Sequence, residues 1–178
     1  DENGDFAFIG AVESSAVPSD DGFVHPAIGY RNYGDATRSH WGSDLSIQYY
    51  ATDKLSVWGN TSWLSQNEWE VGDDDLPFTS SLNAPKFKYR IGLDYAAGDQ
   101  GLRYSVSFQH DDAFNSDMAL YGGRVQEKNL VDLNIGYVFK SGLKLDLSGT
   151  NIFDQKYRSF PSMPIIGRRI IAKLTIDL

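Results

Sequence analysis

Apolar and polar residues alternate with a period of two along most of this chain. The clearest run extends from Lys86 to Ala96, where aromatic and branched residues hold one parity and Lys, Arg, Gly and Asp hold the other. Such alternation is typical of β-strands, and no segment of comparable length shows the 3.6-residue period of an amphipathic helix. The pattern therefore predicts an all-β chain. The seven predicted strands are Trp41–Tyr50, Leu55–Ser65, Lys86–Ala96, Leu102–Asp111, Leu130–Phe139, Leu143–Ile152 and Ile165–Leu178.

The connections between the predicted strands alternate in length. The tight turns are Ala51–Lys54, Ala97–Gly101 and Lys140–Gly142, and the long connections are Gln66–Pro85, Asp112–Asn129 and Phe153–Pro164. In an antiparallel meander, this order places every short turn at one end of the sheet and every long loop at the other. Bacterial outer-membrane barrels show this asymmetry, with short periplasmic turns and longer extracellular loops.

Strand length and the polar parity also favour a membrane-spanning barrel. A run of about 11 residues spans roughly 36 Å, and a tilt near 45° reduces this to about 26 Å, close to the height of the apolar band of an outer-membrane barrel. The alternate strand positions that are polar carry charged residues such as Lys88, Arg90 and Asp132, which suit a wide, water-filled lumen. The prediction is an antiparallel transmembrane β-barrel segment of seven to eight strands. Alternation alone also allows a soluble sheet with its polar face in water.

The first part of the chain follows the pattern less well. Residues 1–38 are expected to form an extracellular loop with a candidate ragged strand at Phe23–Tyr33, which contains Pro26. Residues 39–178 are expected to form the C-terminal transmembrane strands. Single-chain bacterial barrels close with an even number of strands. Seven clear strands therefore leave two alternatives, a small barrel with one ragged strand or part of a larger barrel.

Composition excludes several classes of function. The 178 residues include no Cys, and 24 acidic against 16 basic residues give a formal charge of −8. No nucleic-acid partner is expected, because such binding needs clustered Lys and Arg. The absence of Cys excludes disulfides, thiolate zinc sites and thiol catalysis. There is no apolar run of about 18 residues for a transmembrane helix, and any signal peptide is expected to be already removed or upstream.

Candidate catalytic and metal-binding residues are few. The histidines, His25, His40 and His110, lie on separate segments. Two Asp residues follow His110, which makes it a candidate base or metal ligand, although a polar loop position is the expectation. The acidic run at residues 73–75 lacks the spacing of a calcium loop, and no nucleophile elbow is present. We therefore expect no catalytic residue, no metal site and no cofactor, and no enzyme.

Aromatic residues form two groups. Those on the strands, several near strand ends where amphipathic rings prefer the bilayer interface, are Tyr49, Tyr50, Trp58, Trp63, Tyr95, Tyr104 and Tyr137. Those in the long loops could contact a ligand or anchor the loops by packing. With one loop cation added, the candidate substrate-binding residues are Trp69, Phe78, Phe114, Tyr121 and Arg124.

Five short motifs resemble the C-terminal barrel of TonB-dependent outer-membrane receptors, in the expected order. Asn151–Tyr157 resembles the N-x-F-D-x-x-Y signature that precedes the last strand, and Gly167–Arg169 resembles the start of that strand. Tyr30–Leu45 and Thr52–Trp63 are similar to earlier strands and their turn. Leu82–Lys86 resembles the N-A-P-K start of a strand in Bacteroidota-type receptors with a carboxypeptidase-regulatory-like domain.

This resemblance implies energised import across the outer membrane of a Gram-negative bacterium. Such receptors are 22-stranded barrels closed by a plug, and they import scarce large nutrients such as siderophores, cobalamin or oligosaccharides. The chain would supply the last part of the barrel. Its implied partners are outer-membrane lipid, the remaining strands, the plug and, through the plug, TonB. One departure is Leu178, because the family usually ends in an aromatic residue.

Two other classes of function stay open at this point. An autonomous small outer-membrane barrel with a structural or adhesive role requires an eighth strand within Phe23–Tyr33 that pairs with Ile165–Leu178. A soluble β ligand-binding module requires the face that carries Ile91 to point inward against a covering layer. The opposite face, which carries Arg90, would then lie in water.

Overall fold

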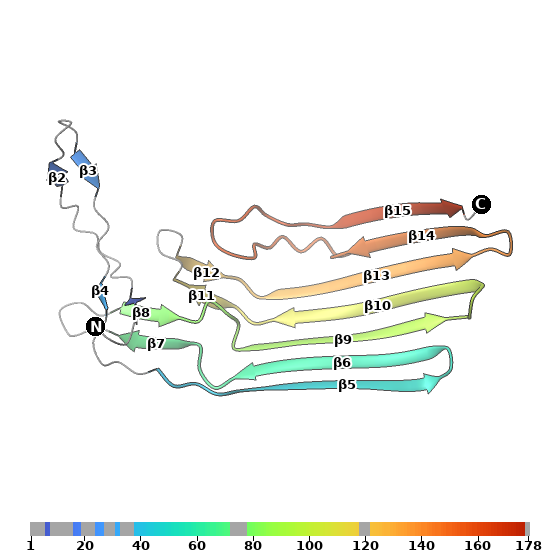
Figure 1. Cartoon of the computed structure of the whole chain (residues 1–178), viewed down its shortest axis with the longest axis horizontal. Helices are drawn as coiled ribbons and strands as arrows, with labels where there is room; N and C mark the ends of the chain where they lie inside the picture. Colours follow the sequence, from blue (N-terminus) through green and yellow to red (C-terminus); the bar gives the residue numbers. More distant parts are fainter. Residues whose placement is uncertain are drawn as a thin grey trace.

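The computed structural model describes residues 6–7, 16–18, 24–26, 31–32, 38–71, 78–117 and 122–176. Its seven long strands are β5 (Gly42–Thr52), β6 (Leu55–Leu64), β9 (Phe87–Ala96), β10 (Gly101–Asp111), β13 (Lys128–Val138), β14 (Leu143–Thr150) and β15 (Arg169–Ile176). They form one antiparallel sheet in the order β15-β14-β13-β10-β9-β6-β5 (Figure 1). The prediction of an all-β fold of antiparallel strands is confirmed, and the sheet does not close on itself within the described residues.

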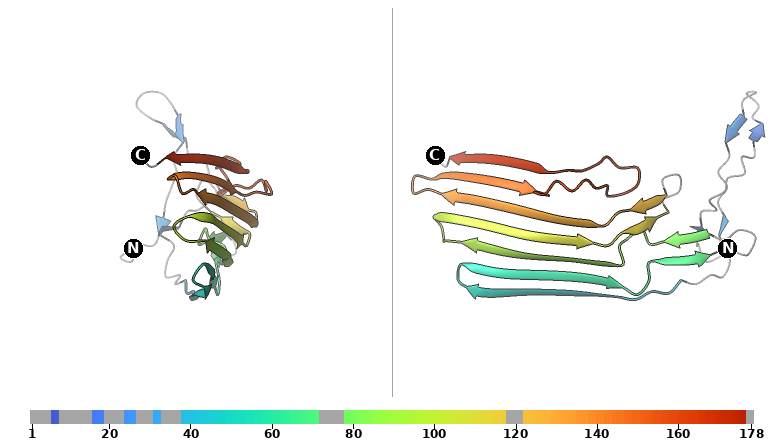
Figure 2. Two further views of the ribbon diagram at one scale, coloured as in Figure 1. Left: turned by 90° about the vertical axis from the view of Figure 1, so that its right-hand side faces the viewer. Right: turned by 180° about the vertical axis from the view of Figure 1, so that it is seen from behind.

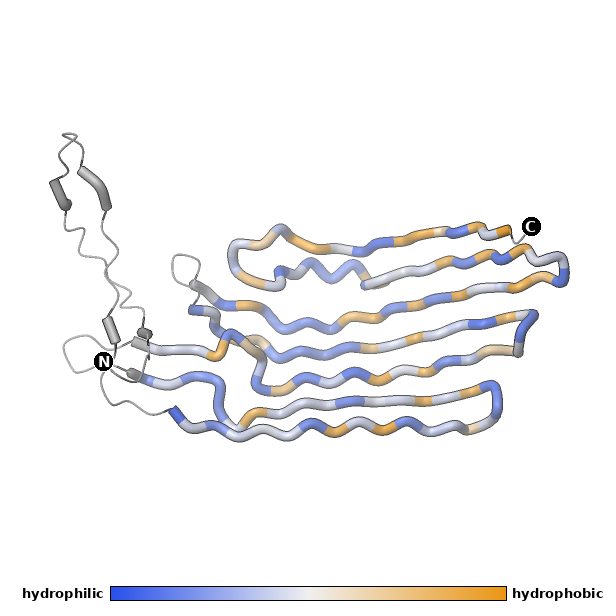
Figure 3. Tube along the Cα trace, viewed as in Figure 1, coloured by the Kyte–Doolittle hydropathy of each residue, from blue (hydrophilic) through white to orange (hydrophobic). Residues whose placement is uncertain are grey.

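The strand register sorts the side chains onto two faces. One row across the sheet reads Tyr49, Val57, Leu93, Val106 and Leu133. An adjacent row reads Ser56, Asp94, Ser105, Asn134 and Ser148. Because neighbouring residues of a strand point to opposite faces, these rows define an apolar face and a polar face, and hydropathy alternates along each strand accordingly (Figure 3).

The apolar face has no second layer over it in the described part of the chain (Figure 2). Ile91, Leu147 and Ile170 keep 53%, 51% and 61% of their surface exposed. Among the described residues, the buried hydrophobic side chains are Phe114, Val125 and Leu130. A soluble sheet must bury its apolar face against another element. The covering layer that the soluble alternative requires is therefore not formed by these residues, whereas an apolar face of this extent suits lipid.

Aromatic side chains border the apolar face at both ends. Near the short turns, Tyr95 stacks on Tyr104 with ring centroids 5.0 Å apart. Near the long loops, Trp41 lies edge-on to Trp63 with centroids 4.6 Å apart. Between them lies a row that is mainly aliphatic, with Val57, Leu93, Val106 and Leu133 side by side. Aromatic borders on either side of an aliphatic band are the arrangement found in outer-membrane barrels.

Two strand aromatics lie on the opposite face from the one expected. Trp58 and Tyr50 fall on the polar parity rather than at the lipid interface. The indole of Trp58 lies over Gly92, where a Cβ would collide with the ring, and its Nε1–H donates to Asp94 Oδ2 at 2.7 Å. Gly92 thus permits close packing on the polar face. The sequence already indicates that Trp58 lies on the polar face, because Ser56 and Asn60, two positions before and after it, are both polar.

The long connections form further structure beyond the strand ends. The first and second contain hairpins, made by β7 (Glu68–Val71) with β8 (Phe78–Ser81) and by β11 (Phe114–Ser116) with β12 (Gly123–Val125). The third, residues 151–168, contains one isolated pairing, between Tyr157 and Ile166. All three lie at one end of the sheet and the short turns lie at the other, as predicted (Figure 1). The described residues contain no helix of the length and apolarity needed to cross a membrane.

The short strands of the first 38 residues pair with one another. They are β1 (Phe6–Ala7), β2 (Ala16–Pro18), β3 (Val24–Pro26) and β4 (Arg31–Asn32). β1 pairs with β4 and β2 pairs with β3, while β15 has β14 as its one neighbour among the described strands. The described part of Phe23–Tyr33 therefore does not form the eighth strand that a small autonomous barrel requires.

Candidate functional site

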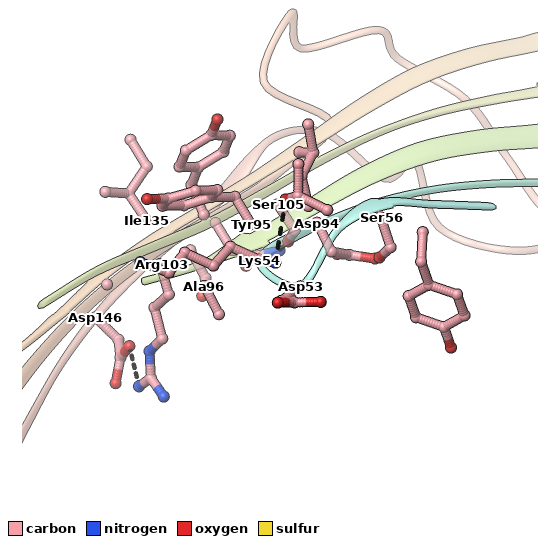
Figure 4. Close-up of a pocket in the computed structure, with 17 residues that line it drawn as sticks. Asp53, Lys54, Ser56, Asp94, Tyr95, Ala96, Arg103, Ser105, Ile135 and Asp146 are labelled. Atoms are coloured by element: carbon pink, nitrogen blue, oxygen red, sulfur yellow. Dashed lines mark hydrogen bonds and ion pairs between the residues drawn. The ribbon is translucent and has the colours of Figure 1, made fainter. Parts of the chain in front are cut away.

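The polar face forms an open pocket of about 420 Å³ near the short turns. Within it, Arg103 donates to Asp146 at 2.6 Å. The two side chains meet above Gly136, where a Cβ would collide with both of them. Figure 4 shows Arg103 and Asp146 on one side of the sheet and Ile135 on the other. Gly136 therefore allows an ion pair to bridge β10 and β14 across the strand between them.

A second polar network lies on the same face near the long loops. Arg90 donates to Gln109, and Gln109 donates to Asp111 at 3.1 Å. The Asp111 carboxylate pairs with Lys128 Nζ at 2.7 Å, and these two side chains are 13% and 16% exposed. Lys128 Nζ also lies 5.6 Å from the ring centroid of Tyr157. These contacts connect β9, β10 and β13 to the third long connection.

Removal of one charge should cost more in the second network than in the first. We expect Asp111→Asn to lower the free energy of unfolding by about 1–3 kcal/mol, because the Lys128 ammonium loses its charged partner and has little access to water. Asp146→Asn is the matched control, since its pair is 46% and 26% exposed and exposed pairs contribute about 0–1 kcal/mol. Urea unfolding of the intact protein in lipid vesicles measures both. Equal losses would contradict the prediction.

The first two hairpins are hydrogen-bonded to each other. The Ser81 N–H donates to Asp117 Oδ2 at 2.7 Å, and the Asp117 N–H donates to Asn83 Oδ1 at 2.8 Å. The Ser81 hydroxyl also donates to the Asn115 carbonyl. Asn83 has a φ of 57°, a left-handed conformation that Asn tolerates because its short side chain can hydrogen-bond locally. The Asn of the N-A-P-K motif thus joins the end of β8 to the end of β11.

The third long connection begins at Asn151, which is 4% exposed and has a φ of 52°. Its N–H donates to Asp132 Oδ1 at 2.8 Å. Its side-chain amide pairs with the backbone of Gln155, accepting from the N–H at 3.0 Å and donating to the C=O at 2.8 Å. Gln155 Oε1 accepts from the Asn129 N–H at 2.7 Å. The first residue of the N-x-F-D-x-x-Y motif therefore fixes the chain leaving β14 against β13.

Asp154, the acidic residue of the same motif, holds the far end of this connection. Its φ is 60°, and its Oδ1 accepts from Lys156 Nζ at 2.8 Å and from the Arg168 N–H at 2.7 Å. The hydrogen bond from Lys156, and then the one from the Arg168 N–H, keep the pKa of Asp154 below its ordinary value. The carboxylate is therefore charged at neutral pH and binds the residue that directly precedes β15.

The third long connection packs against the β11–β12 hairpin. The ring of Phe160 lies edge-on to Phe114, with centroids 6.3 Å apart, and Phe114 is 6% exposed. Pro161 faces Gly123, where a Cβ would lie 3.4 Å from the proline ring. A small pocket of about 170 Å³ lies between the two segments. The two hairpins and residues 151–168 therefore form one packed unit, which we call the loop assembly.

All five candidate substrate-binding residues belong to the first two long connections, and three of them are Trp69, Phe78 and Tyr121. Trp69 lies on β7, and its ring is edge-on to His40 at 5.8 Å. Phe78 begins β8, with Val71 as its backbone partner. Tyr121 lies outside the described residues. Of these three, only Trp69 has a side chain that the structure describes. It lies where β7 meets the segment before β5.

The other two candidates lie on the second hairpin. Phe114 is buried against Phe160, whereas Arg124 is exposed and lines the small pocket of the loop assembly. Lys156 and Arg158 line the same pocket and were not among the candidates. The sequence signal for them is a pair of cations separated by one residue in a chain with an excess of acidic residues, whereas the candidates were mainly loop aromatics.

His110 lies at the end of β10 and is fully partnered. Its Nδ1 is 2.7 Å from Asn129 Oδ1, its Nε2 is 3.0 Å from Asp112 Oδ1, and its ring lies 5.2 Å from that of Tyr89. Both ring nitrogens therefore hold neighbouring segments together. The described residues contain no group of three His, Cys, Asp or Glu that could hold a metal ion, and the acidic run at 73–75 lies outside the described part.

Two solved structures align with part of this chain. A chain of the FpvAI–pyocin S2 complex aligns with a TM-score of 0.56 and 16% sequence identity, over 75% of this chain and 18% of that chain. A mutant of the ferric enterobactin receptor PfeA from Pseudomonas aeruginosa gives a TM-score of 0.48 at 16% identity, over 67% of this chain and 17% of that chain. This chain thus spans less than a fifth of either structure. No curated protein matches its sequence.

A family comparison covers most of the sheet. The sequence model described as "TonB dependent receptor-like, beta-barrel" matches residues 8–152. This span includes the sheet strands from β5 to β14, and the first of the two solved structures shares their fold. The chain belongs to the TonB-dependent receptor-like β-barrel family.

Proposed function

We propose that this chain is the C-terminal part of an outer-membrane receptor of a Gram-negative bacterium, which imports a scarce large nutrient with energy delivered through TonB. The observation that carries the proposal is a sheet with an exposed apolar face, aromatic borders and a charged opposite face. Membership of the family supports it. The nutrient classes considered are siderophores, cobalamin and oligosaccharides. The role is binding and import, without catalysis.

The edges of the sheet support a larger barrel. Among the described strands, β5 pairs with β6 alone and β15 pairs with β14 alone. Every backbone N–H and C=O in lipid needs a partner, so a spanning sheet must close into a barrel. Charged side chains on the polar face favour a wide lumen over a narrow interior filled by packed side chains. We propose that the chain supplies the last seven strands of a 22-stranded barrel, as its resemblance to TonB-dependent receptors implies.

The proposed partners follow from the two faces and the two edges. The apolar face contacts outer-membrane lipid, the polar face contacts the lumen and the plug, and the edges pair with the remaining strands. TonB acts on the plug and so only indirectly on this chain. Residues 1–38 would form an extracellular loop and residues 39–178 the strands, and the Leu82–Lys86 motif supports a Bacteroidota-type receptor.

A denaturing gel of the native outer-membrane fraction tests this proposal. The gel is probed with an antibody against the Gln66–Pro85 loop, with and without boiling. We expect a band several times larger than the 19.9 kDa of this chain, because the proposed barrel has three times as many strands. A heat-modifiable band near 20 kDa would instead support an autonomous small barrel with a structural or adhesive role. Absence from the outer-membrane fraction would contradict both.

A further inference from the structure

The small pocket of the loop assembly is lined by three cationic side chains. Arg124 comes from β12, and Lys156 and Arg158 come from the third long connection. No Asp or Glu is among the residues that line it, although the whole chain carries a formal charge of −8. The pocket is therefore a local positive site in an acidic protein.

The three cations differ in how many of their hydrogen-bond donors are already used. Lys156 Nζ is paired with Asp154 at 2.8 Å, which partly neutralises it. The Arg158 guanidinium donates one hydrogen bond to the Met163 carbonyl and keeps most of its five donors. Arg124 is exposed, and no residue in the described part of the chain hydrogen-bonds or pairs with its guanidinium. The strongest unused donors of the pocket are thus two guanidinium groups.

The remaining lining of the pocket is largely apolar. Val125 is 3% exposed, and the rest of the apolar wall comes from Phe160, Pro161 and Ile165. Charge interactions strengthen when apolar walls displace water. At about 170 Å³, the pocket is well below the roughly 300–1,000 Å³ of pockets that enclose a whole drug-sized ligand. It can hold a single anionic group with a few attached carbons, and not an entire large nutrient.

We propose that this pocket binds an oxyanion, a carboxylate or phosphate group carried by a larger ligand. The planar fork of Arg matches the two oxygens of such groups, and Arg124 and Arg158 supply two forks from different segments. The assignment of that ligand as the imported nutrient rests on the proposed function. A phosphate of an outer-leaflet lipid offers the same chemistry, so the experiment has an arm for each source.

The test uses the intact protein in uncharged detergent micelles, with inorganic phosphate as the soluble probe and diphosphorylated lipid A in mixed micelles as the lipid probe. Broadening of the phosphorus NMR signal measures the binding of each. We expect Arg124→Gln, and separately Arg158→Gln, to weaken phosphate binding at least about tenfold, as loss of a charged hydrogen bond implies. Lys140→Gln removes the same charge from a short turn at the opposite end and should bind like wild type.

The outcomes separate this inference from the proposed function. Loss of binding in Arg124→Gln but not in Lys140→Gln supports the oxyanion site, and the probe that responds identifies the soluble or the lipid source. Binding independent of Arg124 and Arg158 in both arms overturns the site, whatever the outer-membrane gel shows. A protein absent from the outer membrane would overturn the proposed function and leave the phosphate result unchanged. Unaltered heat-modifiable mobility confirms that each variant is folded.

Discussion

Leu93→Arg is expected to prevent this chain from inserting into the outer membrane. Leu93 lies on the apolar face between Val57 and Val106, in the aliphatic band between the two aromatic borders. An Arg on the lipid face near the bilayer midplane costs about 2–4 kcal/mol, a large part of the roughly 5–15 kcal/mol that stabilises a folded protein. Fractionation of cells followed by gels with and without boiling should show loss of the heat-modifiable form.

The matched control introduces the same residue on the polar face. Ser107 lies opposite Gly92, one position along the strand from Val106, and Ser107→Arg points into the proposed lumen. It should insert like wild type. If Leu93→Arg inserts equally well, or remains soluble and folded with only the loss expected for a removed Leu side chain, the apolar face does not meet lipid and the membrane assignment fails.

The strands could be predicted because their pattern depends on residues two positions apart. Period-two alternation reports which face each side chain takes, and all seven long strands lie where this pattern places them. The largest difference concerns the last strand, which begins at Arg169 rather than Ile165. Ile166 pairs with Tyr157, and the Arg168 N–H donates to Asp154 instead of to β14. Ile165 and Ile166 are apolar and so extend the strand pattern, but they belong to the loop.

The loop assembly could not be predicted in the same way. The hydrogen bond between Ser81 and Asp117 joins residues 36 positions apart, and its formation depends on where β8 and β11 leave the sheet. The two hairpins are also too short to show alternation. For the same reason a loop aromatic such as Phe114 could have faced a ligand or packed inside a loop, and the structure shows that it packs against Phe160.

The second large expected effect concerns the start of the third long connection. We expect Asn151→Ala to lower the free energy of unfolding by about 3–4 kcal/mol. A left-handed conformation costs a residue other than Gly about 1–2 kcal/mol, and Asn can offset that cost locally, which Ala cannot. The N–H and C=O of Gln155 also lose their partner, at about 1 kcal/mol each, beside a residue that is only 4% exposed. Urea unfolding in lipid vesicles measures the total.

Two further substitutions separate backbone conformation from hydrogen bonding at Asn151. Asn151→Gly accepts the φ of 52° but removes both side-chain hydrogen bonds, so its loss should be about half that of Asn151→Ala. Asn151→Asp keeps the acceptor for the Gln155 N–H, but it places a carboxylate against the Gln155 carbonyl oxygen in a site that is only 4% exposed. An unpaired charge with little access to water is costly, so its loss should exceed that of Asn151→Gly. Proteolysis between residues 152 and 168 should increase as the free energy of unfolding falls. If Asn151→Ala unfolds like wild type, this Asn does not hold the connection, and its place in the N-x-F-D-x-x-Y motif must come from contacts made outside this chain.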